Sequence, residues 1–161
     1  VIANSDETAD QTLKKEVKDQ VVTYLRSKMN QAASIQAARQ VICQEMDALK
    51  EIAEKKIRQE GYDYPVTVSL GTTYFPVKEY GDMAFPAGDY EALRVQIGKS
   101  KGRNWWCVMY PSLCLVDGVY QTVPENSKDK LKQVLSTSEY QSLVDGGEDV
   151  QFRLRFFDWL F

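Results

Sequence analysis

Residues 61–70, GYDYPVTVSL, mark the point where the chain changes from helical to strand-like patterning. Before this point, apolar residues recur every three to four positions from Ile35 to Ile57, which is typical of one buried helix face. Gly61 fits the residue that ends such a helix. From Pro65 to Leu70, apolar and polar residues alternate, and this period of two predicts a β-strand.

Two helical stretches are expected before Gly61. In the first, from Thr8 to about Met29, Thr8 and Gln11 have the spacing of a capping box. The second, from residue 35 to residue 61, would be about 40 Å long as one helix. We therefore expect it to break near residues 45–47, where Asp47 can cap a new start.

The residues after 70 predict the rest of an α+β domain. Strands are expected at 74–80, 90–97 and 150–156, turn-forming residues at 82–89, and short helices at 127–135 and 138–144. This order predicts one domain over residues 1–161, with N-terminal helices packed on a mostly antiparallel sheet, short C-terminal helices and a final strand.

The composition excludes several classes of protein. With 161 residues, 43% hydrophobic and 27% charged, the chain is neither disordered nor fibrous. It has no apolar run long enough to span a membrane, and a net charge of -3 disfavours nucleic-acid binding. Because the chain contains no histidine, Ser-His-Asp and Cys-His catalysis and His-ligated zinc are excluded. We expect neither a metal nor another cofactor.

Residues 104–115, NWWCVMYPSLCL, are the strongest candidate for a protein-binding site. Adjacent residues of a strand point to opposite faces, so Trp105 and Trp106 are not expected to share one core pocket. One ring is expected to anchor the core and the other to lie near a surface with Met109 or Tyr110, since aromatic side chains often dominate interfaces. The alternative is that both rings cover the edges of a small core.

A small basic cluster precedes this segment. Lys99, Lys101 and Arg103 lie in a polar connection of an acidic chain, and they are expected to flank the exposed ring. Such a cluster can steer an acidic partner or contact anionic lipid headgroups. The alternative is an ordinary solvated loop.

The three cysteines allow one disulfide. Cys107 and Cys114 are the candidates, with Cys43 left free. In one continuous helix their Cα atoms would lie about 10.5 Å apart, too far for a bond. A turn at residues 111–112 would bring them together, and the alternative is two reduced, buried cysteines.

Four stretches together resemble the stage II sporulation protein R family, and they follow one another in order between Val1 and about Val116. They are VIANSD at 1–6, GYDYPV at 61–66, PAGDYEALRVQIG at 86–98 and NWWCVMYPSLC at 104–114. The resemblance implies a secreted signalling protein, not an enzyme, that is made in the forespore of endospore-forming bacteria. The family carries a hydrophobic export segment before the first motif, so we expect that such a segment preceded Val1 and was removed.

The resemblance also implies a partner and a location. The protein is exported into the space between the forespore and mother-cell membranes. There the basic cluster could also contact a membrane surface. In the same space, the protein binds the extracytoplasmic part of a membrane-embedded aspartic protease, which then processes the precursor of sigma E; no nucleic acid or small-molecule substrate is implied. Export would favour the disulfide, because this space is not reducing.

Two other functions are alternatives to this signalling role. An extracytoplasmic enzyme acting on cell-wall glycans would need two carboxylates about 5 to 9.5 Å apart in a cleft, and the candidates are Asp82, Asp89, Glu91 and Asp117. The other alternative is a purely structural protein of the cell envelope.

Overall fold

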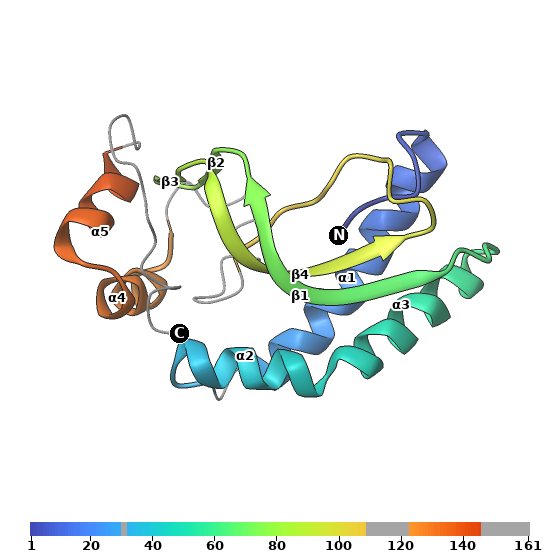
Figure 1. Ribbon diagram of the computed structural model, residues 1–161, viewed down its shortest axis with the longest axis horizontal. Helices are drawn as coiled ribbons and strands as arrows, with labels where there is room; N and C mark the ends of the chain where they lie inside the picture. Colours follow the sequence, from blue (N-terminus) through green and yellow to red (C-terminus); the bar gives the residue numbers. More distant parts are fainter. Residues whose placement is uncertain (30–31, 109–122, 146–161) are drawn as a thin grey trace. The chain divides into compact units, whose positions relative to one another are not determined.

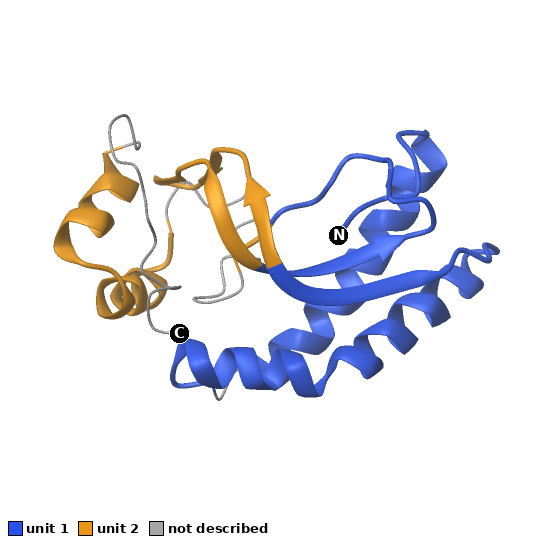
Figure 2. Cartoon of the chain, in the orientation of Figure 1, with its two compact units in different colours: residues 1–71, 92–106 blue, residues 72–91, 107–161 orange. Residues whose placement is uncertain are grey.

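The computed structural model describes residues 1–29, 32–108 and 123–145 (Figure 1). The chain divides into two compact units, which are described separately (Figure 2). Unit 1 contains residues 1–71 and 92–106, and unit 2 contains residues 72–91 and the chain from residue 107 onward. In the described ranges, no helix is long and apolar enough to cross a membrane.

Three helices form one layer of unit 1. They are α1 (Thr8–Met29), α2 (Ile35–Gln44) and α3 (Met46–Gln59). Leu13 and Val17 of α1 and Leu49 and Ala53 of α3 belong to the core, as their helical spacing predicts. Ser34 begins α2 by accepting a hydrogen bond from the backbone of Ala37.

The predicted break in the second helical stretch is confirmed at Glu45, between α2 and α3. The Glu45 carboxylate also holds α1, because it accepts a hydrogen bond from the Tyr24 hydroxyl at 2.5 Å and lies 3.1 Å from Lys28 Nζ. A second bridge joins α3 to α1, where Lys56 Nζ lies 3.1 Å from Glu16.

Two long strands form the second layer. Strands β1 (Val66–Phe75) and β4 (Gly88–Ile97) are hydrogen-bonded neighbours of ten residues each, and they run in opposite directions in Figure 1. Both strands were predicted, but β1 is longer than expected, since it continues through Gly71. Just beyond both strands, the backbone of Gly98 donates a hydrogen bond to the Pro65 carbonyl at 2.9 Å.

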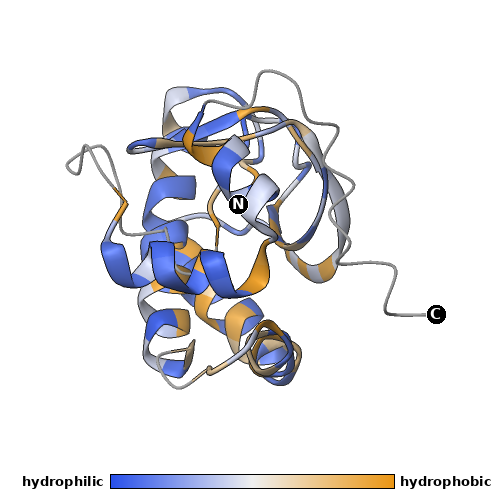
Figure 3. Ribbon diagram, turned by 90° about the vertical axis from the view of Figure 1, so that its left-hand side faces the viewer, coloured by the Kyte–Doolittle hydropathy of each residue, from blue (hydrophilic) through white to orange (hydrophobic). Residues whose placement is uncertain are grey.

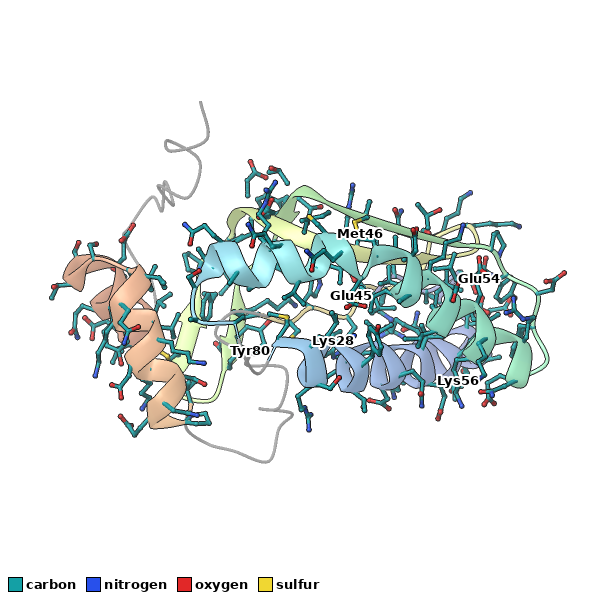
Figure 4. The ribbon with its side chains drawn as sticks, turned by 90° about the horizontal axis from the view of Figure 1, so that it is seen from below. Lys28, Glu45, Met46, Glu54, Lys56 and Tyr80 are labelled. Carbon is teal, nitrogen blue, oxygen red and sulfur yellow. The ribbon has the colours of Figure 1, made fainter. Side chains whose placement is uncertain are left out.

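The helices of unit 1 all lie on one side of this ribbon, as Figures 1 and 3 show. Seen from below in Figure 4, the helices lie in front of the strands, and Lys28 and Glu45 are close together. Val66, Val95, Ile97 and Ala3 are buried and complete the core from the strand layer. The opposite face of the ribbon is covered by no described helix of unit 1 (Figure 3).

Unit 2 contains a short hairpin and two helices. Strands β2 (Lys78–Tyr80) and β3 (Met83–Phe85) pair antiparallel, and they are followed by α4 (Glu125–Val134) and α5 (Thr137–Val144). The two short helices were predicted within a few residues. Strand β3, however, lies where only turn residues were expected. The core of this unit is formed by Met83, Val123, Leu131 and Leu143.

The predicted α+β class, with N-terminal helices, an antiparallel pair of strands and short C-terminal helices, is therefore confirmed. The expected final strand at 150–156 lies outside the described residues, as does the aromatic tail at 156–161.

Candidate partner-binding surface

The first residues of the chain extend the strand layer of unit 1. Ile2 forms a parallel bridge to Gln96 of β4 and an antiparallel bridge to Asn104. Val1 and Trp105 exchange two backbone hydrogen bonds, at 2.8 and 2.9 Å. The segment before the tryptophans is therefore fixed to β4 through the N-terminal residues.

A buried carboxylate organises the contact between the N-terminal segment and α1. Asp10 is only 4% exposed, and its Oδ2 accepts hydrogen bonds from Asn4 Nδ2 at 2.8 Å and from the Ser5 hydroxyl at 2.5 Å. Burial raises the pKa of Asp10, but hydrogen bonds from Ser5, Asn4 and Tyr64 lower it more, so the net pKa lies below its usual value. Asp10 is thus held in its charged form.

The same N-terminal residues hold the basic loop 98–103. Asn4 Oδ1 accepts a hydrogen bond from the backbone of Lys99 at 2.9 Å, and Asp6 Oδ1 accepts one from the backbone of Arg103 at 2.6 Å. The Asn4 carbonyl accepts a further bond from the backbone of Lys101 at 3.1 Å. The loop backbone is therefore fixed, while Lys99, Lys101 and Arg103 are themselves exposed.

The side chain of Lys14, on α1, also holds the loop 98–103 in place. It is only 6% exposed, and its Nζ donates to Gln11 Oε1 at 2.7 Å and to the Arg103 carbonyl at 3.0 Å. Burial lowers the pKa of Lys14, and the nearby charges of Arg103 and Lys15 lower it further. Gln11 in turn donates to the Ser5 carbonyl and to Asp6, and Thr8 is already the first residue of α1. The capping box predicted for Thr8 and Gln11 is therefore replaced by contacts to the preceding segment.

The two adjacent tryptophans are both half-buried. Lys18 Nζ of α1 lies 5.3 Å from the centre of the Trp105 ring, so this ring faces the helices. Because side chains alternate along an extended backbone, Asn104 and Trp106 lie on the face of the strand layer that points away from the helices. Neither side chain is fully enclosed, and the role of one ring as a partner contact stays a prediction.

Several predicted site residues lie outside the described part of the chain: Met109, Tyr110, Cys114 and Asp117. Cys107 takes part in a disulfide, whereas Cys43 is an exposed free thiol. The pairing of Cys107 with Cys114 stays a prediction.

The candidate carboxylates of the enzyme alternative have structural contacts or are exposed. Asp82 lies 2.7 Å from Lys128 Nζ and accepts a backbone hydrogen bond from Val123 at 2.6 Å. The hydrogen bond from Lys128 lowers the pKa of Asp82, which is the wrong direction for a general acid. Asp89 and Glu91 are exposed on β4. Within the described ranges, no group of three potential metal ligands lies together.

The polar network around Asn4, Ser5, Asp10 and Lys14 was not identified from the sequence. The N-terminal motif VIANSD is easily recognised in the sequence. Its role in fixing the loop 98–103, however, depends on contacts with residues about a hundred positions away. Lys99 and Asn4, for example, are 95 residues apart in the chain.

Comparison with known proteins assigns this chain to a family. A family model described as stage II sporulation protein R matches residues 1–120. A protein of Bacillus subtilis (strain 168), described as stage II sporulation protein R, is 36% identical over 130 residues, which cover 81% of this chain and 58% of that relative. The matched part is less than two thirds of the relative's length. No solved structure matches this chain.

Proposed function

Because the chain belongs to the stage II sporulation protein R family, we propose that it is a secreted, non-enzymatic signal in endospore formation. It acts between the forespore and mother-cell membranes and binds the extracytoplasmic part of a membrane-embedded aspartic protease. Binding activates this protease, which then processes the precursor of sigma E.

The single observation that carries the proposal is the family match, and it gives the sporulation role. The geometry of unit 1 is consistent with a role in binding another protein. A buried network built on Asp10 and Lys14 fixes the backbone of the loop 98–103, while the loop's cationic side chains point into solvent. Such a pre-organised surface loses little conformational entropy when it binds a partner.

The chemistry of this surface suggests how the partner is recognised. Lys99 and Lys101 are exposed and place positive charge on one loop of a chain whose net charge is -3. This local positive charge favours approach to an acidic region of the protease. Trp106 then provides a large apolar contact on the face of the layer that no described helix of unit 1 covers.

The direct test is reconstitution in a bacterium that does not sporulate. The protease, the sigma E precursor and the full secreted protein are produced together, and precursor processing is followed by immunoblot. We expect processing only when all three are present. Processing that is equally efficient without this protein would overturn the proposal.

Charge-reversed variants make the same assay specific for the surface. Lys99→Glu with Lys101→Glu should lower processing strongly and leave the melting temperature unchanged, since both side chains are exposed. The matched control is Lys50→Glu with Lys55→Glu, which changes the net charge equally on exposed positions of α3. If both pairs have the same effect, net charge and not this loop governs signalling.

A further inference from the structure

The pairing of β1 with β4 brings two polar residues opposite each other. The hydrogen bond from Gly98 to Pro65 lies just outside the two strands, which have equal lengths. Counting back along both strands from this pair, Val66 lies opposite Ile97, and Ser69 lies opposite Arg94. Directly opposite residues of an antiparallel pair share a face and lie about 5 Å apart between Cβ atoms.

Ser69 and Arg94 lie on the face that points away from the helices. Val66 and Ile97, an odd number of positions away on the same strands, are buried in the helix-side core, so alternation places Ser69 and Arg94 on the other side. The bridge to Gln96 places Ile2 on this face as well, and the bridge to Ile2 adds Asn104.

Both polar side chains lack a partner where one is expected. The Oγ atom of Ser69 and the Nε atom of Arg94 are buried from solvent, and neither has a hydrogen-bond partner. A buried donor without an acceptor costs about 1 to 3 kcal/mol, which the isolated protein must bear.

We infer that Arg94, together with Ser69, binds a carboxylate of an acidic protein segment at this face of the sheet. This inference rests on the proposed function and names the contact that the protease makes. A guanidinium that has already lost part of its water binds a carboxylate more strongly than an exposed one does, and its planar fork favours two parallel hydrogen bonds. The Ser69 hydroxyl supplies a further donor beside it.

The charge pattern favours a protein carboxylate over a lipid surface. Arg94 is the single cation among the positions that alternation places on this face, and its neighbours Ser69, Gln96, Asn104 and Ile2 are neutral. One cation among neutral donors matches one carboxylate. Binding to anionic lipid, in contrast, depends on several exposed cations near the surface.

The test measures the affinity of the secreted protein for the detergent-solubilised protease. Arg94→Gln and Arg94→Met should weaken binding at least tenfold, and Arg94→Lys should bind with intermediate affinity because it keeps the charge but loses the fork. Arg58→Gln, which removes an exposed arginine of α3, should bind like the wild type. The melting temperatures of Arg94→Gln and Arg94→Met should be at least as high as that of the wild type, because the Nε donor that they remove is buried without a partner.

The outcomes separate this inference from the proposed function. If the wild-type protein neither binds nor activates the protease, both fail. If the wild type binds and Arg94→Gln binds equally well, only the inference fails. Vesicles of phosphatidylglycerol provide the second arm: loss of vesicle binding without loss of protease binding in Arg94→Gln would overturn the inference in favour of lipid. A large loss of thermal stability in both Arg94→Gln and Arg94→Met would overturn it in favour of a purely structural role.

Discussion

The backbone of Gly102 lies against the Ser5 carbonyl so closely that a Cβ atom at position 102 would overlap the carbonyl oxygen and approach Ala3. This contact joins the basic loop to the N-terminal segment, together with the hydrogen bond from the Gly102 backbone to the Ala3 carbonyl at 3.0 Å. The fit leaves no room for any side chain at this position.

Gly102→Ala should therefore lower the free energy of unfolding by about 2 kcal/mol, because the two segments must move apart. Urea denaturation measures the change. Gly71→Ala is the matched control, since a Cβ there meets no atom within 4 Å, and it should leave stability nearly unchanged. Equal effects of the two substitutions would contradict this contact.

The sequence was sufficient for the elements whose signal is local. The spacing of Leu13, Val17 and Val21 predicts α1, and the alternation after Pro65 predicts β1, because a helix or strand face repeats within a few residues. The break at Glu45 was also predictable, from the length of the apolar pattern. That Glu45 is held by Tyr24 and Lys28 of α1 was not, because that contact requires the packed helices.

The residues of the candidate partner-binding surface could likewise be predicted only in part from the sequence. Tryptophans and lysines are conspicuous in a sequence, so Trp105, Trp106 and Lys99 could be proposed as binding residues, and their role in binding stays a prediction. Arg94 and Ser69 were not selected, because each looks ordinary within an alternating strand. Only the register of β1 and β4 shows that they lie opposite each other, and only the packing shows that their donors have no partner.

Asp10→Asn tests the network under the N-terminal segment. The amide keeps the shape of the carboxylate but removes its charge and one acceptor for Ser5 and Asn4, so stability at pH 7 should fall by about 2 to 3 kcal/mol. Because the pKa of Asp10 is lower in the folded protein, its contribution is fully present above the unfolded value of about 4 and is lost as the pH falls through the folded pKa.

The difference between wild type and Asp10→Asn should accordingly shrink when urea denaturation is repeated well below pH 4. Asp129→Asn, at an exposed position of α4, serves as the control and should show only a small difference at either pH. If the difference in unfolding free energy between wild type and Asp10→Asn is the same at pH 7 and below pH 4, the charge of Asp10 does not stabilise the fold.

Glu45→Gln should change the ionisation of Tyr24. The hydrogen bond to Glu45 raises the pKa of the Tyr24 hydroxyl, with burial and the negative charge of Glu45 acting in the same direction. The variant should therefore titrate closer to the ordinary tyrosine value near 10. Carbon NMR of the tyrosine ring carbons measures this pKa, and Tyr24→Phe assigns the signal. Glu54→Gln should leave it unchanged, and an identical shift in both glutamine variants would contradict the contact.

The thiol chemistry gives a simple count. The unfolded, unreduced protein should react with one equivalent of a thiol reagent, because Cys43 is free and Cys107 is in a disulfide. Reduction should raise the count to three. Cys43→Ser should lower the unreduced count to zero with little effect on stability, since this position is exposed. Non-reducing peptide mapping then tests whether Cys114 is the partner of Cys107, and three reactive thiols before reduction would exclude the bond.

Lys18 should distinguish the two neighbouring tryptophans. Its Nζ lies 5.3 Å from the centre of the Trp105 ring, so a double-mutant cycle of Lys18→Met and Trp105→Phe should give a coupling free energy of about 0.5 to 1 kcal/mol. The matched cycle uses Trp106→Phe, and its coupling to Lys18 should be close to zero because alternation directs this ring to the opposite face. Urea denaturation of the single and double variants measures both couplings. If Lys18 couples as strongly to Trp106 as to Trp105, the two rings do not diverge, and the face assigned to Trp106, Ser69 and Arg94 would have to be abandoned.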